Sequence, residues 1–311
     1  MSITYEEQAT RSALWLRGFF HAPTGAGKSK GSLRLASRLF GGELRTTLLN
    51  SEQGRGRLYA DRITYDLIDL AQLTASGQAD FSPATWIKAI DVAEERNPGG
   101  IFVLDSVSHE WMGKNGVLQQ ADRFGDWKTV RPRHAEFVER LLAVEGHVIV
   151  CCRSKMKYEV SEEEVPGRAK PRQTVLALGV GPIQDSELQY EFNLVGQFEQ
   201  RTHEVTFSGH VDPLVDTVHD LDNDDELDAV CAALEKWLSE GDPIVAPPTA
   251  DEKEVTKLRG LLDAAGISAE DIEKGFSIAR RQNRGQLHPD WVAKKIEERQ
   301  TPATPAPAAA E

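Results

Sequence analysis

The chain has 311 residues, of which 40% are hydrophobic and 27% are charged, and its formal net charge is −13. These values are typical of one large or two smaller soluble domains and exclude a disordered or fibrous protein. No run reaches the ~18–20 apolar residues that a bilayer-spanning helix needs, and the apolar run 13–22 follows two acids rather than a basic start, so we expect a cytoplasmic protein with no membrane contact.

The predicted elements alternate between strands and helices. In chain order we expect strands over 14–21, 46–50, 101–105 and 147–152, and helices over 27–40, 59–71, 83–96 and 131–144. The runs 101–105, up to its final acid, and 147–152 are apolar, and strands buried on both faces and separated by helices predict a mainly parallel sheet flanked by helices, the α/β class. Short strands over 174–178, 190–195, 197–199 and 205–207 would extend the sheet, and a helix over 227–238 follows.

Acidic residues are concentrated late in this region. Between Asp212 and Asp242 stand eleven acidic residues and one basic residue, Lys236, so the remainder is nearly neutral and could carry a local basic surface. We interpret the acidic segment as a solvated face. The three cysteines include no CxxC pair, which predicts neither a zinc ribbon nor a disulfide framework.

The composition changes after residue 242. Residues 243–250 (PIVAPPTA) are typical of a linker, and capping signals at Thr249 and Ser268 predict a small helical module over 251–300. The final stretch 301–311 (TPATPAPAAAE) cannot build a core, and we expect it to be disordered. The sequence therefore predicts a main domain over 1–242, a linker, a small module and a tail.

Segment 22–29 follows an apolar strand and opens a helix, the setting that a phosphate-binding P-loop requires. Glycines let successive N–H groups turn toward an anion, and the helix N-terminus adds partial positive charge. We predict that ATP binds here, with Lys28 at the β- and γ-phosphates and the Ser29 hydroxyl on Mg²⁺. Ala22 replaces the first glycine of the pattern, which is tolerable if that residue keeps a negative φ. The predicted nucleotide-binding residues are Ala22, Pro23, Thr24, Gly25, Ala26, Gly27, Lys28 and Ser29.

A second motif lies at Ile101–Asp105, where four apolar residues end in an acid, the Walker B pattern. Its carboxylate would lie beside the P-loop and hold Mg²⁺ through water. Many ATPases place a catalytic Glu directly after this Asp, but Ser106 stands here. Glu52, just beyond the strand 46–50, is our candidate for orienting the attacking water. Glu110 is the rival, and the alternative for Glu52 is an exposed loop residue.

Together these residues resemble the RecA-like ATPases, and more closely the phage-encoded members associated with single-strand annealing and recombination. The resemblance covers roughly 10–210. It is carried by the P-loop 22–29, by Leu49-Asn50-Ser51-Glu52 with Gly54-Arg55 and Tyr59-Ala60, by Val103-Leu104-Asp105-Ser106 with Trp111, by Trp127 through 148–150 into Arg153-Ser154-Lys155, and by 188–195. It implies a catalytic Glu at the end of the strand that follows the P-loop helix, and a host-cell cytoplasmic location.

The resemblance also implies that strand 147–152 lies between the P-loop and Walker B strands. Arg153 and Lys155 would then project toward the γ-phosphate or a neighbouring subunit, where they would sense the nucleotide or stabilise developing charge. Arg153 departs from the polar sensor residue found in RecA. The alternative for both cations is a loop surface.

Single-stranded DNA and further copies of the chain are the partners that the resemblance implies. Two loops are candidates for DNA contact, 109–133 and 155–172, whose cations would bind phosphates while Trp111, Trp127 or Tyr158 stack on bases. We expect an ATP-hydrolysing protein of phage recombination or replication, acting as a homo-oligomer. The alternatives are a DNA helicase or helicase loader, and an ATP-dependent assembly switch with little turnover and no DNA binding.

Overall fold

A computed structural model describes residues 10–70, 79–121, 123–163 and 172–242, with Gly260, Gly266 and Ser268. The chain divides into two compact units, Met1–Asp242 and Pro243–Glu311. Apart from the three single residues, the expected linker, helical module and tail lie outside the described part, so those assignments stay predictions. None of the helices in the described ranges has the length and apolar character that a membrane span requires.

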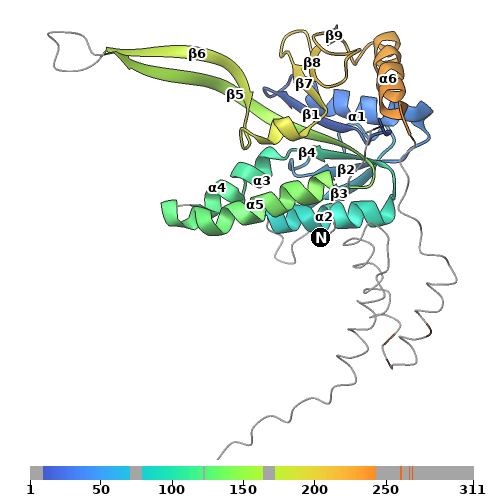
Figure 1. Cartoon of the computed structure of the whole chain (residues 1–311), viewed down its shortest axis with the longest axis horizontal. Coiled ribbons are helices and arrows are strands. Elements are labelled where there is room, and N and C mark those ends of the chain that lie inside the picture. The colour runs from blue at the N-terminus through green and yellow to red at the C-terminus, as the bar shows by residue number, and fades with distance from the viewer. Residues whose placement is uncertain are drawn as a thin grey trace, which may run out of the picture. The chain divides into compact units, whose positions relative to one another are not determined.

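The described strands join in one sheet of order β3-β2-β4-β5-β1-β7-β8-β9, with β6 paired to β5 outside this row (Figure 1). Neighbours from β3 across to β7 are parallel, whereas β6, β8 and β9 are antiparallel to the strands that they pair with. The parallel strands therefore present their carboxyl ends at one edge. The strands are β1 (Arg17–Ala22), β2 (Thr46–Asn50), β3 (Asp66–Asp69), β4 (Ile101–Asp105), β5 (His147–Glu163), β6 (Arg172–Pro182), β7 (Leu194–Phe198), β8 (Val205–Gly209) and β9 (Val218–His219).

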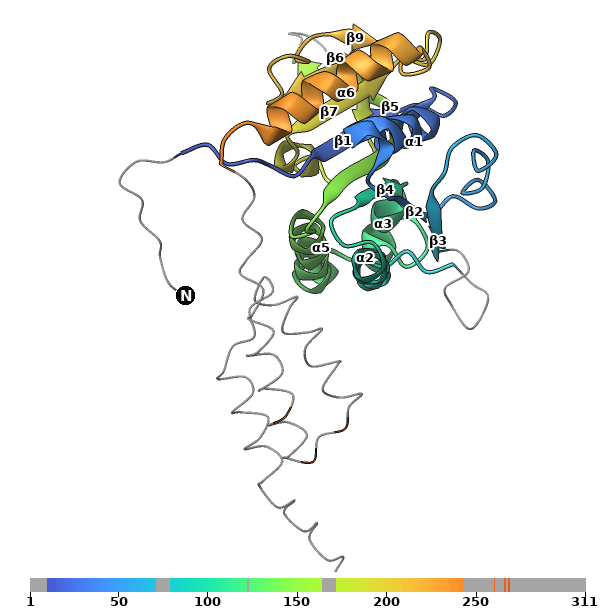
Figure 2. The ribbon, with the colours of Figure 1, turned by 90° about the vertical axis from the view of Figure 1, so that its right-hand side faces the viewer.

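Helices cover both faces of the parallel part of the sheet (Figure 2). Successive side chains of a strand point to opposite faces, so Phe20 packs into the cluster shared with α1 and α6, and Phe19 into the cluster shared with α2 and α5. The helices are α1 (Lys28–Arg38), α2 (Pro83–Arg96), α3 (Ser108–Met112), α4 (Val117–Gln120), α5 (Trp127–Leu142) and α6 (Asp224–Ser239), with 3-10 turns η1 (Leu39–Gly42), η3 (Phe124–Asp126) and η4 (Leu188–Glu191).

This architecture confirms the predicted class, an α/β P-loop fold with a mainly parallel sheet. The bounds of β2, β4 and α2 agree with the predicted ranges 46–50, 101–105 and 83–96. Strand β5 lies between β1 and β4, as the resemblance implied. Elsewhere the boundaries move, and the predicted strands 190–195 and 197–199 are the turn η4 followed by the single strand β7.

The predicted helix over 59–71 is wrong. Only one helical turn forms, where the backbone N–H of Ile63 donates to Tyr59 at 2.9 Å. The chain then extends as β3, an edge strand parallel to β2. Leu67 packs into the cluster on the α1 side, and Ile68 into the cluster on the α2 side. Apolar residues whose spacing fits a helix can thus form an edge strand when they pack against the two opposite faces of the sheet.

The prediction that a strand ends at Cys152 is also wrong. Strand β5 continues to Glu163 and pairs antiparallel with β6, so most of the expected loop 155–172 is a long β-hairpin that projects from the domain (Figure 1). The segment between its strands lies outside the described residues. The other expected loop, 109–133, is mostly helical, because it contains α4, most of α3 and the start of α5.

The acidic segment 212–242 is not simply a solvated face, since its carboxylates pair with basic residues of α1. Lys30 contacts Asp222 at 2.7 Å, and Arg34 contacts Asp224 at 2.7 Å. Arg38 and Asp228 form the next such pair along the helix. Basic residues four apart lie on one face of a helix, so α1 carries a basic stripe whose partners are Asp222, just before α6, and two aspartates in the first turns of α6.

Candidate nucleotide-binding site

The P-loop connects β1 to α1 at the carboxyl edge of the sheet. Gly25 and Gly27 have φ of 85° and 83°, in the left-handed region that glycine adopts without steric cost. Ala22 is the last residue of β1, opposite Arg153, and has no positive φ. The strand conformation therefore explains why alanine is acceptable at the first position of the motif.

The turn between β7 and β8 braces the P-loop from outside. The Gln200 side chain donates to the Thr24 carbonyl at 2.9 Å. A Cβ on Gly27 would lie 3.5 Å from the Cβ of His203, so this turn lies directly against the loop. Sequence reasoning missed both residues, since nothing in the local pattern 199–204 connects it to a motif some 175 residues earlier.

Lys28 and Asp105 form a buried ion pair between the two motifs. The Lys28 Nζ lies 2.7 Å from Asp105 Oδ1, and both side chains are less than 10% exposed. Burial lowers the pKa of Lys28, but the Asp105 carboxylate outweighs burial and the net shift is upward. Burial raises the pKa of Asp105, but Lys28 and a hydrogen bond from Ser29 bring it below its usual value. Both groups are therefore charged at neutral pH.

Ser29 and Asp105 offer the oxygen ligands that Mg²⁺ prefers. A hydroxyl and a carboxylate lie within hydrogen-bond reach of each other, which suits an ion that is otherwise held by water and nucleotide phosphates. Bound there, the ion would neutralise charge that develops on the phosphate oxygens.

Glu52 lies at the same sheet edge and is only 8% exposed, so it is not an exposed loop residue. Asn50, at the end of β2, lies opposite Asp105 in the register. Its side chain accepts a hydrogen bond from the Glu52 N–H at 3.2 Å and donates to the Glu52 carbonyl at 2.9 Å. Gly56 permits this arrangement, because a Cβ there would approach the Asn50 amide within 2.8 Å.

Two arginines hold the Glu52 carboxylate. Arg153 contacts Oε1 through Nε at 2.9 Å and through Nη2 at 2.8 Å. Arg55 contacts Oε2 through Nη1 at 3.0 Å. Arg153 was predicted to face the γ-phosphate or a neighbour, and here it pairs within its own subunit. The contact of Arg55 was not predicted, although its spacing of three residues from Glu52 across a turn offered a signal.

A network of hydroxyl groups connects the ends of β2 and β4. The Ser51 hydroxyl accepts from the Ser106 N–H at 2.9 Å and lies 2.8 Å from His109 Nδ1. Burial, with help from the positive charge of Arg153, lowers the pKa of His109, so the ring is neutral at physiological pH. This network fixes the segment that carries Glu52 against the Walker B strand.

Glu110, the rival to Glu52, is fully buried, and its described partners are neither Glu52 nor Lys28. Its carboxylate lies 3.0 Å from His134 Nδ1 and 3.2 Å from Gln184 Nε2. Burial raises its pKa, and the hydrogen bonds only partly oppose that shift. This buried carboxylate is bonded through both oxygens to residues of other segments, so it connects structural elements.

Lys155 lies farther along β5, opposite Gly181 in β6, and is exposed. Within the described residues it makes no hydrogen bond or ion pair with Glu52, Lys28 or Asp105. Of the four predicted catalytic residues, the structure therefore brings together Glu52, Lys28 and Arg153 at the sheet edge and leaves Lys155 on the hairpin.

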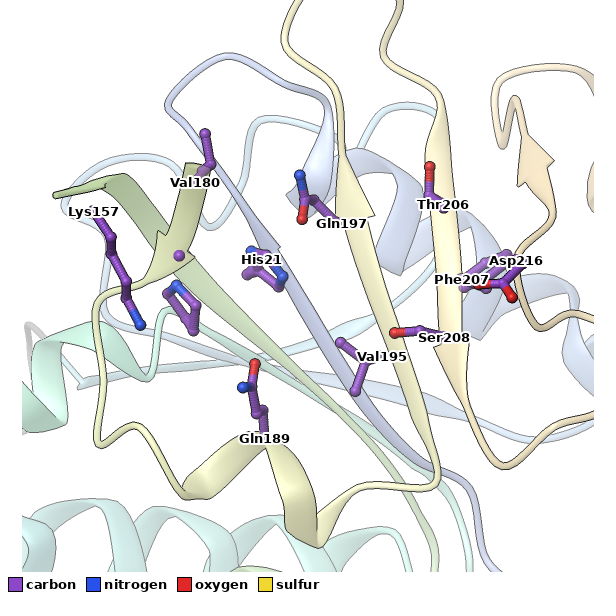
Figure 3. Close-up of a pocket in the computed structure, with 12 residues that line it drawn as sticks. His21, Lys157, Val180, Gln189, Val195, Gln197, Thr206, Phe207, Ser208 and Asp216 are labelled. Carbon is purple, nitrogen blue, oxygen red and sulfur yellow. The ribbon is translucent and has the colours of Figure 1, made fainter. Parts of the chain in front are cut away.

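A polar pocket of about 520 Å³ opens at the base of the hairpin. Figure 3 shows His21, the residue before the P-loop, between Lys157 of β5 and Gln197 of β7. His21 Nδ1 lies 2.9 Å from the Ser154 hydroxyl, and burial lowers the pKa of the ring to about 4. The pocket thus adjoins the phosphate loop on the sheet face opposite α1.

The geometry joins a P-loop, a Walker B carboxylate and a buried glutamate at one sheet edge, which is the equipment of a nucleotide-binding ATPase. The family described as AAA domain matches residues 16–229, more than half of the chain. No curated protein matches the sequence. The chain therefore belongs to the AAA domain family of P-loop ATPases.

Proposed function

We propose that this protein is a RecA-like enzyme that hydrolyses ATP and acts on single-stranded DNA in phage recombination or replication. The observation that carries the proposal is the placement of Glu52. It follows β2 rather than β4, and its peptide groups are held by Asn50, which lies opposite Asp105, the partner of Lys28. A buried acid two residues beyond this strand is the arrangement implied by the RecA resemblance.

In the proposed reaction, ATP lies along residues 22–29 with its γ-phosphate near Lys28. A water molecule attacks the γ-phosphorus, and the bond to the oxygen bridging the β- and γ-phosphates breaks as the new bond forms. Glu52 orients the water and accepts its proton. Lys28 stabilises the charge on the phosphate oxygens, and Arg153 would exchange Glu52 for the γ-phosphate. ADP and inorganic phosphate leave.

Glu52→Gln tests the assignment of the base. The change preserves shape and removes the proton acceptor, so turnover should fall roughly 100-fold or more while ATP affinity stays close to that of the parent. The measurements are steady-state release of phosphate and equilibrium binding of a fluorescent ATP analogue. Glu110→Gln is the matched control, and equal losses in both variants would remove Glu52 from the proposed role.

Single-stranded DNA is the partner that the exposed cations favour. Lys155 is exposed on the hairpin and Lys157 lines the pocket at its base. Lys128, Arg131 and Arg133 are exposed on α5, whose start lies on the side of the domain toward which the hairpin projects (Figure 1). Cations on two neighbouring elements could follow a phosphate backbone without reading bases. Trp111 and Trp127 are half-buried and pack together at 6.2 Å, which makes them poorer stacking platforms than predicted.

The test of the DNA partner is ATP turnover with and without single-stranded DNA at low and moderate salt. Stimulation that weakens as salt rises would support phosphate contacts. Turnover that ignores DNA at both salt concentrations would keep the ATPase and remove the DNA role. Sedimentation with and without nucleotide tests the proposed homo-oligomer, in which Lys155 could reach the phosphates of a neighbour.

A second candidate function, an ATP-dependent assembly switch with little turnover, is favoured by one observation. Both oxygens of Glu52 contact arginines, so the carboxylate is occupied in this structure. A switch of this kind would bind ATP tightly and change its oligomeric state without DNA. Turnover that stays negligible in every condition, combined with ATP-dependent assembly, would favour it over the enzyme.

A further inference from the structure

Of the two described arginines that contact the Glu52 carboxylate, Arg55 belongs neither to a Walker motif nor to β5. Its guanidinium binds Glu52 Oε2 at 3.0 Å, while Arg153 occupies Oε1. A carboxylate that acts as base must accept a hydrogen bond from the attacking water. The arginines already take three of the roughly four acceptor sites that a carboxylate offers, so withdrawal of one arginine would make room for the water.

The two arginines differ in how easily they can leave. Arg153 extends from β5 and is 39% exposed, and a γ-phosphate bound beside Lys28 would compete with Glu52 for it. The Arg55 side chain is 62% exposed and belongs to the turn that follows β2. It faces solvent more than the nucleotide site, so the anion that draws it away would come from outside.

We propose that Arg55 is a positioning residue that restrains Glu52 at rest, and that a phosphate of bound nucleic acid releases Glu52 by taking Arg55 as its own partner. The inference rests on the proposed function and deepens it, because it states how DNA would raise ATP turnover. A planar guanidinium forms paired hydrogen bonds equally well with carboxylate and phosphate, so the exchange replaces one good partner with another.

The location of Arg55 fits a phosphate backbone. The turn 51–64 leaves the carboxyl edge of β2, and the hairpin with Lys155 leaves the same edge from β5. A strand of nucleic acid lying across the base of the hairpin would pass along this edge. Arg62, in the same turn, already pairs with Asp61 and therefore serves as a matched control.

The first test is ATP turnover by Arg55→Gln. Without DNA, basal turnover should rise about two- to fivefold, the size expected for losing one partly exposed ion pair. The further stimulation by single-stranded DNA should shrink accordingly. Arg55→Lys should restore low basal turnover, and Arg62→Gln should match the parent. Unchanged basal turnover would overturn the proposal, and a loss of turnover with ATP binding intact would instead make Arg55 a catalytic cation.

The second test needs no hydrolysis and uses linkage between the two contacts of Arg55. Affinity for a fluorescent single-stranded oligonucleotide is measured at low salt for the parent, Glu52→Gln, Arg55→Gln and the double variant. If Glu52 and phosphate compete, Arg55→Gln weakens DNA binding by a larger factor in the Glu52→Gln background than in the parent. Equal factors, as expected for Arg62→Gln, would mean that Arg55 adds only general positive charge.

The two tests distinguish an error about the Arg55–Glu52 contact from an error about the proposed function. If the parent neither binds DNA nor responds to it, and Arg55→Gln still raises basal turnover, the restraint on Glu52 stands and the nucleic-acid phosphate is overturned. If turnover rises with protein concentration and not with DNA, a second copy supplies the anion instead. If neither the parent nor any variant hydrolyses ATP, the proposed enzymatic function is wrong. The DNA affinities of the four proteins then decide by themselves whether Glu52 and phosphate compete for Arg55.

Discussion

Two ion-pair clusters at the same sheet edge differ in which partners are buried. In the Lys28–Asp105 pair both side chains are less than 10% exposed. In the Glu52 cluster the acid is buried, whereas Arg153 and Arg55 are 39% and 62% exposed. Separating a buried pair leaves an uncompensated charge in the interior, while an exposed arginine exchanges its partner for water at small cost. The first cluster is therefore built to stay fixed and the second to rearrange.

The largest expected effect comes from breaking the fixed pair. Lys28→Ala removes the cation that would contact the β- and γ-phosphates, so turnover should fall roughly 100- to 1,000-fold. It also leaves Asp105 buried and unpaired, which should lower the free energy of unfolding by about 3–5 kcal/mol unless the acid takes up a proton. Phosphate release and urea denaturation measure the two effects.

The double variant Lys28→Ala with Asp105→Asn separates chemistry from folding. A neutral amide at position 105 removes the unpaired charge, so most of the lost stability should return while turnover stays low. If stability does not recover, the cost of Lys28→Ala comes from lost packing along the lysine stem rather than from the isolated charge, and the contrast between the two clusters weakens.

His147 extends the comparison to a buried ionisable group that has no oppositely charged partner among its described contacts. Its Nδ1 accepts a hydrogen bond from the Leu16 N–H at 3.1 Å, so the ring must be neutral there. Burial, with help from Arg17, lowers its pKa from 6.5 to about 4. The native state therefore binds fewer protons than the unfolded chain, and the stability that His147 contributes is lost as pH falls from about 6.5 toward 4.

The size of this loss is up to about 3 kcal/mol for a shift of this order. His147→Asn keeps an acceptor at the place of Nδ1 and cannot titrate, so the variant should lose less stability than the parent between pH 7 and pH 4.5. Urea midpoints at the two pH values measure the difference. Parallel loss in both proteins would show that His147 is not a source of acid sensitivity.

A smaller effect is expected from loosening the Glu52 cluster through its backbone. Asn50→Ala removes both hydrogen bonds to the Glu52 peptide groups, so the carboxylate should shift and turnover should fall about tenfold while ATP affinity is retained. Asn97→Ala is the control, because this buried amide bonds Arg45 and Thr47 at the opposite edge of the sheet. It should cost stability without lowering turnover per folded molecule.

The elements that sequence reasoning predicted best are those whose pattern and packing agree. Strands β2 and β4 are buried at every residue, and both motifs lie at strand ends, so the position of Asp105 beside the P-loop followed from the class of sheet. The expectation that Glu52 lies at the same edge followed from the strand order, and the register confirms the order.

What could not be predicted depends on contacts between distant segments. Arg153 is drawn to Glu52 across β4, and Gln200 reaches the P-loop from a turn that carries no motif. The hairpin was not predicted because the residues beyond Cys152 no longer follow the apolar pattern of the buried strand. The backbone pairing of β5 with β6 nevertheless continues to Glu163. Strands of mixed polar and apolar composition give no clear periodic signal.

The smallest effect concerns the exposed pairs between α1 and the acidic segment. Lys30 and Asp222 lie 2.7 Å apart but are 34% and 37% exposed, so water and salt compete for both charges. Lys30→Ala should lower the free energy of unfolding by no more than about 0.5 kcal/mol, and less in high salt. Lys28→Ala, two residues earlier in the same helix, differs mainly in burial. The measurement is thermal unfolding of both variants in low and high salt. If both lost similar stability, burial would not distinguish an ion pair that stays fixed from one that exchanges partners. Exposure would then give no reason to expect that Arg55 can leave Glu52.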